Sequence, residues 1–94
     1  RQSLLAQWGA TIRTRVEKRK SSPRGTRASG TTVLRVTVSR SGALVLVAVA
    51  KSSGHPDLDR AAVKAVRKAR YPAAPKGLEA GEYHFNLPLA FRRG

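Results

Sequence analysis

Apolar residues near the start of the chain recur at the spacing of one helical face. After an adjacent first pair they follow at steps of three or four, which predicts an amphipathic helix over residues 1–20. The residues on this predicted stripe are Leu4, Leu5, Trp8, Ile12 and Val16. Ser3 is suited to cap the first turn, and Lys18–Lys20 suit the negative end of the helix dipole. Gly9 disfavours a helix by about 1 kcal/mol relative to alanine, so we expect the first turns to fray.

Residues 21–29 lack periodicity and contain proline, glycine and serine, which predicts a connecting loop. A two-residue period follows from Thr31 to Ser39, with Leu34, Val36 and Val38 sharing one face. Turn residues at 40–42 lead to a second strand over Leu44–Ala50. In that strand one face carries valines and the other leucine and alanines, so alternation leaves the core face open. We expect the valines to point inward: Val45, Val47 and Val49.

A second helix is predicted from Asp57 to Arg70, ending before Pro72 and Pro75. Its apolar side is rich in alanine, which permits close approach to a sheet; it comprises Leu58, Ala61, Ala62, Ala65, Val66 and Ala69. Residues 82–91 alternate most clearly of all. One face of that last strand carries Tyr83, Phe85, Leu87, Leu89 and Phe91. The fold class is therefore α+β in the order α-β-β-α-β, with both helices on one face of a three-stranded antiparallel sheet and residues 30–94 forming the main domain.

Pro88 marks the last strand as a sheet edge, because proline has no N–H to donate to a neighbouring strand. In an antiparallel strand, residues two apart direct their backbone polar groups to the same side. The free edge should therefore carry the backbone groups of His84, Asn86, Pro88 and Ala90. Two interpretations remain open: Pro88 and Arg92-Arg93 protect the edge from pairing, or the edge is a docking surface.

The chain has 19 Lys and Arg against 5 Asp and Glu, a formal net charge of +14. Such a balance favours polyanions, anionic membranes or acidic protein surfaces. Its basic residues are dispersed and lack the aromatic, zinc-finger or helix-turn-helix patterns of nucleic-acid-binding domains.

The chain has no cysteine, and it has no apolar run near the roughly 20 residues of a membrane span. Because the chain begins with Arg1 and not methionine, we expect it to be part of a longer protein.

The residues that could carry catalysis form no recognisable catalytic motif in the sequence. Asp57 and Asp59 lie near His55, but a helix start attracts aspartate for capping, so we expect capping and not a metal site. His84 alternates with core positions and is expected to be exposed. The glycines do not have the spacing of nucleotide-binding loops. We expect no enzyme, no cofactor, no metal and no small-molecule substrate.

Three segments of the chain resemble the TonB C-terminal family. Val49–Ala69 contains the family's Ser-Ser-Gly and Leu-Asp motifs, as Ser52-Ser53-Gly54 and Leu58-Asp59, and its helical alanines. Gly30–Val49 is similar to the family's first two strands, and Leu87–Phe91 to its closing strand. The resemblance covers Gly30–Arg92. Where the family usually has Tyr-Pro after the first helix, this sequence has Ser22-Pro23.

The resemblance implies a periplasmic domain of a protein anchored in the bacterial inner membrane, where it works with proton-driven motor proteins. Such domains grip the short N-terminal TonB box of an outer-membrane transporter as an added strand and act on its plug, in uptake of iron-siderophores, haem or similar cargo. The implied partner-binding residues are Glu82, Tyr83, His84, Phe85, Asn86, Leu87, Pro88 and Ala90, with Arg24 and Arg27 in the loop. A TolA-like envelope domain is the nearest alternative, although TolA-type domains often carry a disulfide. A basic nucleic-acid-binding module is the alternative from another class; a steep salt dependence of DNA binding would identify it.

Overall fold

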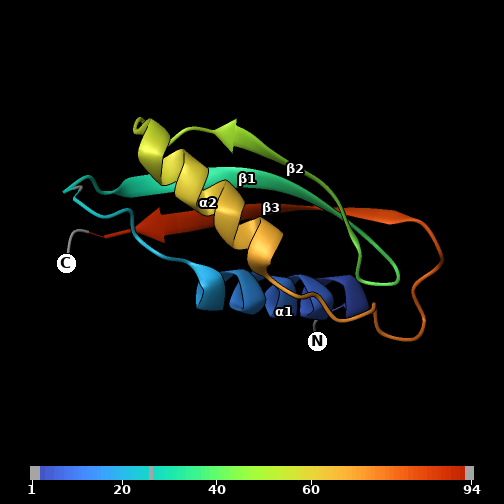
Figure 1. The fold of residues 1–94 in the computed structure, drawn as a ribbon. Helices are drawn as coiled ribbons and strands as arrows, with labels where there is room; N and C mark the ends of the chain where they lie inside the picture. The colour runs from blue at the N-terminus through green and yellow to red at the C-terminus, as the bar shows by residue number, and fades with distance from the viewer. Residues whose placement is uncertain (1–2, 26, 93–94) are drawn as a thin grey trace.

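Two helices lie on one face of a three-stranded antiparallel sheet (Figure 1). The computed structural model describes residues 3–25 and 27–92. Its elements are α1 (Leu4–Arg19), β1 (Gly30–Ser39), β2 (Leu44–Lys51), α2 (Pro56–Lys68) and β3 (Glu82–Phe91). The strand order is β2-β1-β3, so β1 is central and both β2 and β3 are edges. The predicted fold class and element order are confirmed. Within the described ranges, neither helix is long and apolar enough to cross a membrane.

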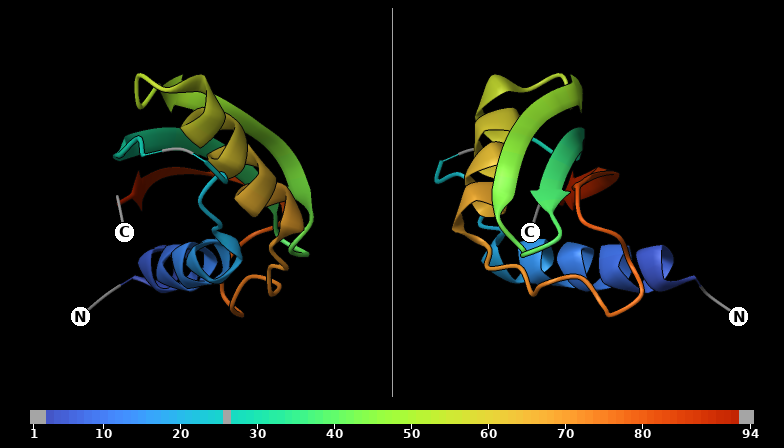
Figure 2. Two further views of the ribbon diagram at one scale, coloured as in Figure 1. Left: turned by 60° about the vertical axis from the view of Figure 1, so that its left-hand side comes forward. Right: turned by 90° about the vertical axis from the view of Figure 1, so that its right-hand side faces the viewer.

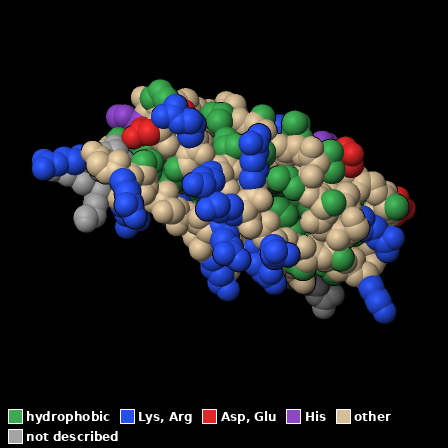
Figure 3. All heavy atoms as spheres, viewed as in Figure 1, with side chains coloured by type: hydrophobic (Ala, Val, Ile, Leu, Met, Phe, Trp, Pro, Cys, Tyr) green, Lys and Arg blue, Asp and Glu red, His purple; other side chains and the backbone are tan. Residues whose placement is uncertain are grey.

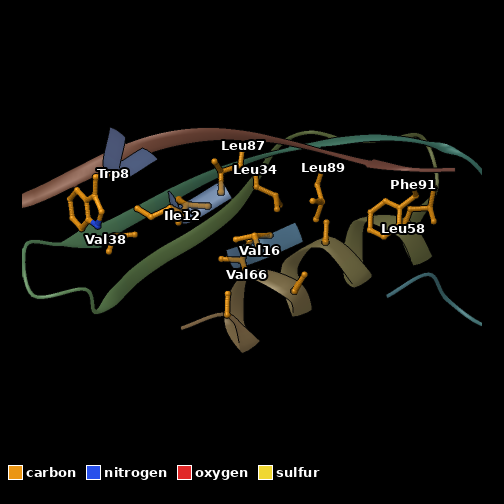
Figure 4. Close-up of a cluster of buried hydrophobic side chains, with 14 residues drawn as sticks. Trp8, Ile12, Val16, Leu34, Val38, Leu58, Val66, Leu87, Leu89 and Phe91 are labelled. Atoms are coloured by element: carbon orange, nitrogen blue, oxygen red, sulfur yellow. The ribbon is translucent and has the colours of Figure 1, made fainter. Parts of the chain in front are cut away.

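The core lies between the sheet and the two helices (Figure 4). Leu34, Val36 and Val38 of β1 are fully buried, as their alternation predicts. Helix α2 meets them with its small, closely spaced apolar residues, all buried: Leu58, Ala62, Ala65 and Val66, followed by Ala69 just past the helix end. Alanines at the contact let the helix backbone approach the strands, so the core is closed by packing in a chain that has no cysteine.

Helix α1 contributes Trp8, Ile12 and Val16 to the same core. Its N-cap is Ser3, whose Oγ accepts the Ala6 N–H at 3.1 Å, as predicted. The predicted apolar stripe of α1 is wrong at its first two residues, because Leu4 and Leu5 are 38% and 39% exposed. The start of α1 extends past the edge of the sheet (Figure 2), which agrees with the exposure of these two residues.

The inward valines of β2 are only partly confirmed. Val47 pairs with Val36 and packs against the core, and Val49 pairs with Leu34 but stays 41% exposed. Val45 is 47% exposed, and Leu44 packs against the core in its place. The cause is a shift of register: Val38 pairs with Leu44 while Thr37 pairs with Leu46, so Val45 is an extra, bulged residue.

The loop before α2 is held by the carboxylate of Asp59. Oδ1 accepts the Ser53 N–H at 2.9 Å and the Thr32 hydroxyl at 2.7 Å, and Oδ2 accepts the Ser52 hydroxyl. Asp59 therefore joins the loop to β1, which corrects the expected capping role. The N-cap position is His55, whose side chain makes no capping bond, and Pro56 starts the helix. The Ser-Ser-Gly and Leu-Asp motifs of the sequence thus form one hydrogen-bonded unit.

These hydrogen bonds, that of Ser52 first, hold the pKa of the Asp59 carboxyl well below its usual range despite partial burial. Since the folded state favours the charged form, the resulting stability is complete above about pH 4 and is lost as pH falls through the folded-state pKa.

Asp59→Asn should lower the free energy of unfolding by about 1–2 kcal/mol at pH 7. Urea denaturation should show the deficit shrinking at pH 3. Asp57→Asn is the matched control, because among the described residues the Asp57 carboxylate accepts a hydrogen bond from the adjacent Leu58 N–H alone. An equal loss in both variants would contradict the role of Asp59.

Candidate functional site

The free edge of β3 can be assigned from two hydrogen bonds at the strand ends. The Arg40 N–H donates to the Gly81 carbonyl at 3.1 Å, so the polar groups of Gly81 face β1. The Ser39 N–H donates to the Ala43 carbonyl at 2.9 Å, so those of Ser39 face β2. The register of β1 and β3 is continuous from Ser39↔Glu82 to Gly30↔Phe91. By alternation, the odd-numbered residues of β3 bond to β1 and the even-numbered ones point outward.

The far end of this edge is already occupied by a side chain. Nζ of Lys20 donates to the Ala90 carbonyl at 2.6 Å and lies 3.1 Å from the Glu17 carboxylate. The same ammonium lies 5.7 Å from the centre of the Phe91 ring. The outward direction of the Ala90 carbonyl agrees with the alternation, and Lys20 closes the edge beyond Pro88.

A groove runs between α1 and the open part of β3. Its volume is about 490 Å³. From α1 it is lined by Ser3, Leu5, Ala6, Gly9, Ala10 and Arg13, and from β3 by His84–Leu87. Gly9 matters here, because a Cβ at this position would lie 3.1 Å from the Phe85 ring. The missing side chain lets α1 approach the strand while the groove stays open.

Aromatic contacts fix the distance between α1 and β3. The Trp8 ring meets Tyr83 and Phe85 edge to face, each at 5.6 Å between centroids. The Trp8 Nε1–H donates to the Pro72 carbonyl at 3.0 Å, which also ties α1 to the segment after α2. The groove is therefore bounded by a packed helix and a paired strand.

The proposed binding residues of β3 divide by side-chain direction. Glu82, His84, Asn86 and Pro88 are exposed, Ala90, Tyr83 and Phe85 are partly buried, and Leu87 is buried. His84 is exposed as expected, and its Nδ1 lies 2.8 Å from the Thr37 hydroxyl of β1. A partner at this edge would meet backbone groups and the α1 side of the groove. No pattern in the sequence predicted that Leu5, Arg13 or Lys20 lies at this site. Gly9, which is unfavourable inside a helix, was the one sign of a close approach.

The loop arginines do not join the β3 groove. Arg24 lines a separate hollow beside α2, together with Asp57, Arg60 and Lys64. Arg27 is exposed. Since Arg24 lies by the start of α2, the two parts of the predicted binding set form no single surface.

Within residues 3–25 and 27–92, no group of His, Asp or Glu side chains is placed to hold a metal ion. His84 pairs with a threonine hydroxyl, and His55 is exposed at the start of α2. What the edge of β3 offers is a row of backbone donors and acceptors, which suits binding of an extended peptide.

A family model described as the Gram-negative bacterial TonB protein C-terminal domain matches residues 23–92. The chain belongs to this TonB C-terminal family. It is 41% identical over 63 residues to a Pseudomonas aeruginosa protein named tonB2. The match covers 67% of this chain and 23% of that protein, so the chain spans about a quarter of its relative's length.

Two solution structures of the Helicobacter pylori TonB C-terminal domain share the fold. The longer fragment aligns with a TM-score of 0.77 at 21% identity, covering 92% of this chain and 80% of that one. The shorter aligns with a TM-score of 0.68, also at 21% identity, covering 97% and 95%. The TonB family match favours a TonB-type over a TolA-like domain, and it begins at Pro23, inside the loop that follows α1.

Proposed function

We propose that this domain is the receptor-engaging part of a TonB-type energy transducer and binds the TonB box of an outer-membrane transporter as a strand added to β3. One observation carries the proposal: the backbone groups of His84 and Asn86 lie on the outward edge of β3, beside an open groove between β3 and α1. An extended peptide there gains backbone hydrogen bonds to the edge and side-chain contacts to α1.

The groove also sets the register of the added strand. Pro88 provides no donor, and the Ala90 carbonyl is bonded to Lys20. The partner strand therefore pairs mainly along residues 82–87. Side chains directed toward α1 meet a gap beside Gly9, with Leu5 and Arg13 at its rim. This supplies selectivity that backbone pairing alone lacks.

In the whole protein this domain follows an inner-membrane anchor and lies in the periplasm, where motor proteins supply the force. The partners are a TonB-dependent receptor with its box and plug, and the cargo is an iron-siderophore, haem or a similar substrate. The domain binds and transmits force without catalysis of its own. The net charge of +14 accelerates encounter with acidic receptor faces and makes the association rate sensitive to salt.

A TonB-box peptide of the cognate transporter should perturb backbone amides of residues 82–91 in an NMR titration. Because the Asn86 N–H faces the groove, its hydrogen exchange should slow once peptide is bound. The Leu87 amide already faces β1, so its hydrogen-exchange rate should change little and serves as the internal control. A cognate box that perturbs only β2 or α1 would overturn the docking edge. A scrambled box should leave the spectrum unchanged.

A further inference from the structure

The second edge of the sheet, β2, is open and unusually apolar. Residues 44–50 contain no charge and no proline, the devices that commonly protect an edge strand. Leu46 is 53% exposed and Val49 is 41% exposed. Only Lys51 at the strand end is charged. Such an edge needs either a partner or another means of protection.

The backbone groups available on β2 follow from the same alternation. The Ser39 N–H faces β2, and so do the polar groups of Thr37 and Arg35. Their partners, Leu46 and Ala48, therefore bond inward to β1. Val47 and Val49 then present their N–H and C=O groups outward, along a stretch without register shifts from Leu46 to Val49.

A groove borders this edge on the side of α2. Its volume is about 360 Å³, with Val49 and Val63 as its apolar contacts. Arg60, Lys64 and Arg67 follow one another on α2 at steps of four and three and form a basic rim. Asp59 also lines the groove, but its carboxylate is bonded to Ser52, Ser53 and Thr32. Among the described residues, the rim cations have no carboxylate within salt-bridge distance.

The charge of the surrounding surface selects the occupant. Lys and Arg side chains gather over α2 and α1 on this face of the molecule (Figure 3). A second copy would bring another formal charge of +14 against the same rim, so pairing of two copies is opposed. A strand added to β2 would direct alternate side chains toward α2 and toward the opposite sheet face, where Leu46 is exposed. Acidic residues fit the first direction and apolar residues the second.

We propose that the β2 edge and the α2 groove bind an extended segment of a partner protein in which acidic and apolar residues alternate. The carboxylates pair with Arg60, Lys64 and Arg67, and the apolar side chains cover Leu46. This site is separate from the β3 edge, because β2 and β3 are the opposite edges of the sheet. Both edges can be filled at once, so the domain holds two extended segments together.

A short peptide alternating glutamate with valine is the probe, with titration followed by NMR and calorimetry. Amide shifts should fall on residues 46–50 and 60–67. Reversing charge with Lys64→Glu and Arg67→Glu should weaken binding about tenfold or more. Lys18→Glu with Arg19→Glu is the matched control: both residues are exposed near the end of α1, and the net charge changes equally. Equal weakening by the two pairs would reduce the effect to general charge attraction and overturn the site.

Backbone pairing is tested by Val49→Pro, which removes an outward N–H and leaves the inward bonds of Ala48 in place. Loss of peptide binding with an unchanged fold supports strand addition. Retained binding overturns it, as does equal affinity for a peptide with lysine in place of glutamate. Dimerisation lost in Val49→Pro on sedimentation would assign the edge to a second copy instead.

Saturating TonB-box peptide should leave binding of the glutamate-valine peptide unchanged, and the α2 variants should leave box binding unchanged. The two sites can thus fail separately. If the box peptide does not bind β3 but the alternating peptide binds β2, the proposed function is lost and this inference stands. If the alternating peptide shifts only residues 82–91, this inference is lost.

Discussion

Val66→Asp is expected to unfold the domain. Val66 is 0% exposed and lies between α2 and the sheet in the common core. A carboxylate there has no partner, and burying it costs several kcal/mol, comparable with the roughly 5–15 kcal/mol stability of a small domain. The variant should lose its cooperative thermal transition and its dispersed NMR spectrum.

The control for this prediction is Val45→Asp. Val45 is 47% exposed in the bulge of β2, so its carboxylate remains hydrated. This variant should melt within a few degrees of the parent. Should Val66→Asp melt like Val45→Asp, the core position of α2 would be wrong.

Asn86→Pro is expected to weaken TonB-box binding strongly while the domain stays folded. Asn86 pairs with Arg35, and by alternation its N–H faces the groove and not β1. Proline removes that donor and places its ring where the partner strand would lie, so affinity should fall about tenfold or more. Isothermal calorimetry with the box peptide measures the loss, and circular dichroism checks the fold.

Two further substitutions, one at the neighbouring residue and one at Asn86 itself, are the controls for this test. Leu87→Pro removes a donor that faces β1 and should destabilise the whole domain. Asn86→Ala keeps the backbone donor and should bind the box nearly as the parent does. Full affinity in a folded Asn86→Pro variant would rule out strand addition at this edge.

Periodicity predicted the elements well wherever one face of an element is buried along its whole length. The faces of β1 and β3 and the stripe of α2 are confirmed because the core contacts each of them. The prediction was wrong at Val45, where a bulge changes the face, and at Leu4 and Leu5, where α1 extends past the sheet. A bulge, and the point at which a neighbouring element ends, depend on tertiary contacts, so the local alternation of apolar and polar residues does not predict them.

The candidate site was predictable in its backbone and not in its surroundings. Pro88 alone indicated which strand is an edge and which of its residues face outward. The groove depends on how α1 packs beside β3, through Trp8 against Tyr83 and Phe85. Similarly, the position of Asp59 near a helix start predicted a capping role. Its hydrogen bond to the Thr32 hydroxyl of β1 could not be predicted, because Thr32 is distant in sequence. Packing of separated segments sets both features.

The central position of β1 also determines the order in which the domain can assemble. β1 and β2 are joined by a short turn, whereas β3 pairs with β1 only after α2 and the following segment have been made. Local hairpins form before contacts that close long loops. A growing chain therefore has its β2 edge early and its β3 edge last. Until β3 docks, one side of β1 is unpaired, so an incomplete chain is prone to aggregation and lacks the edge to which we propose that the TonB box binds.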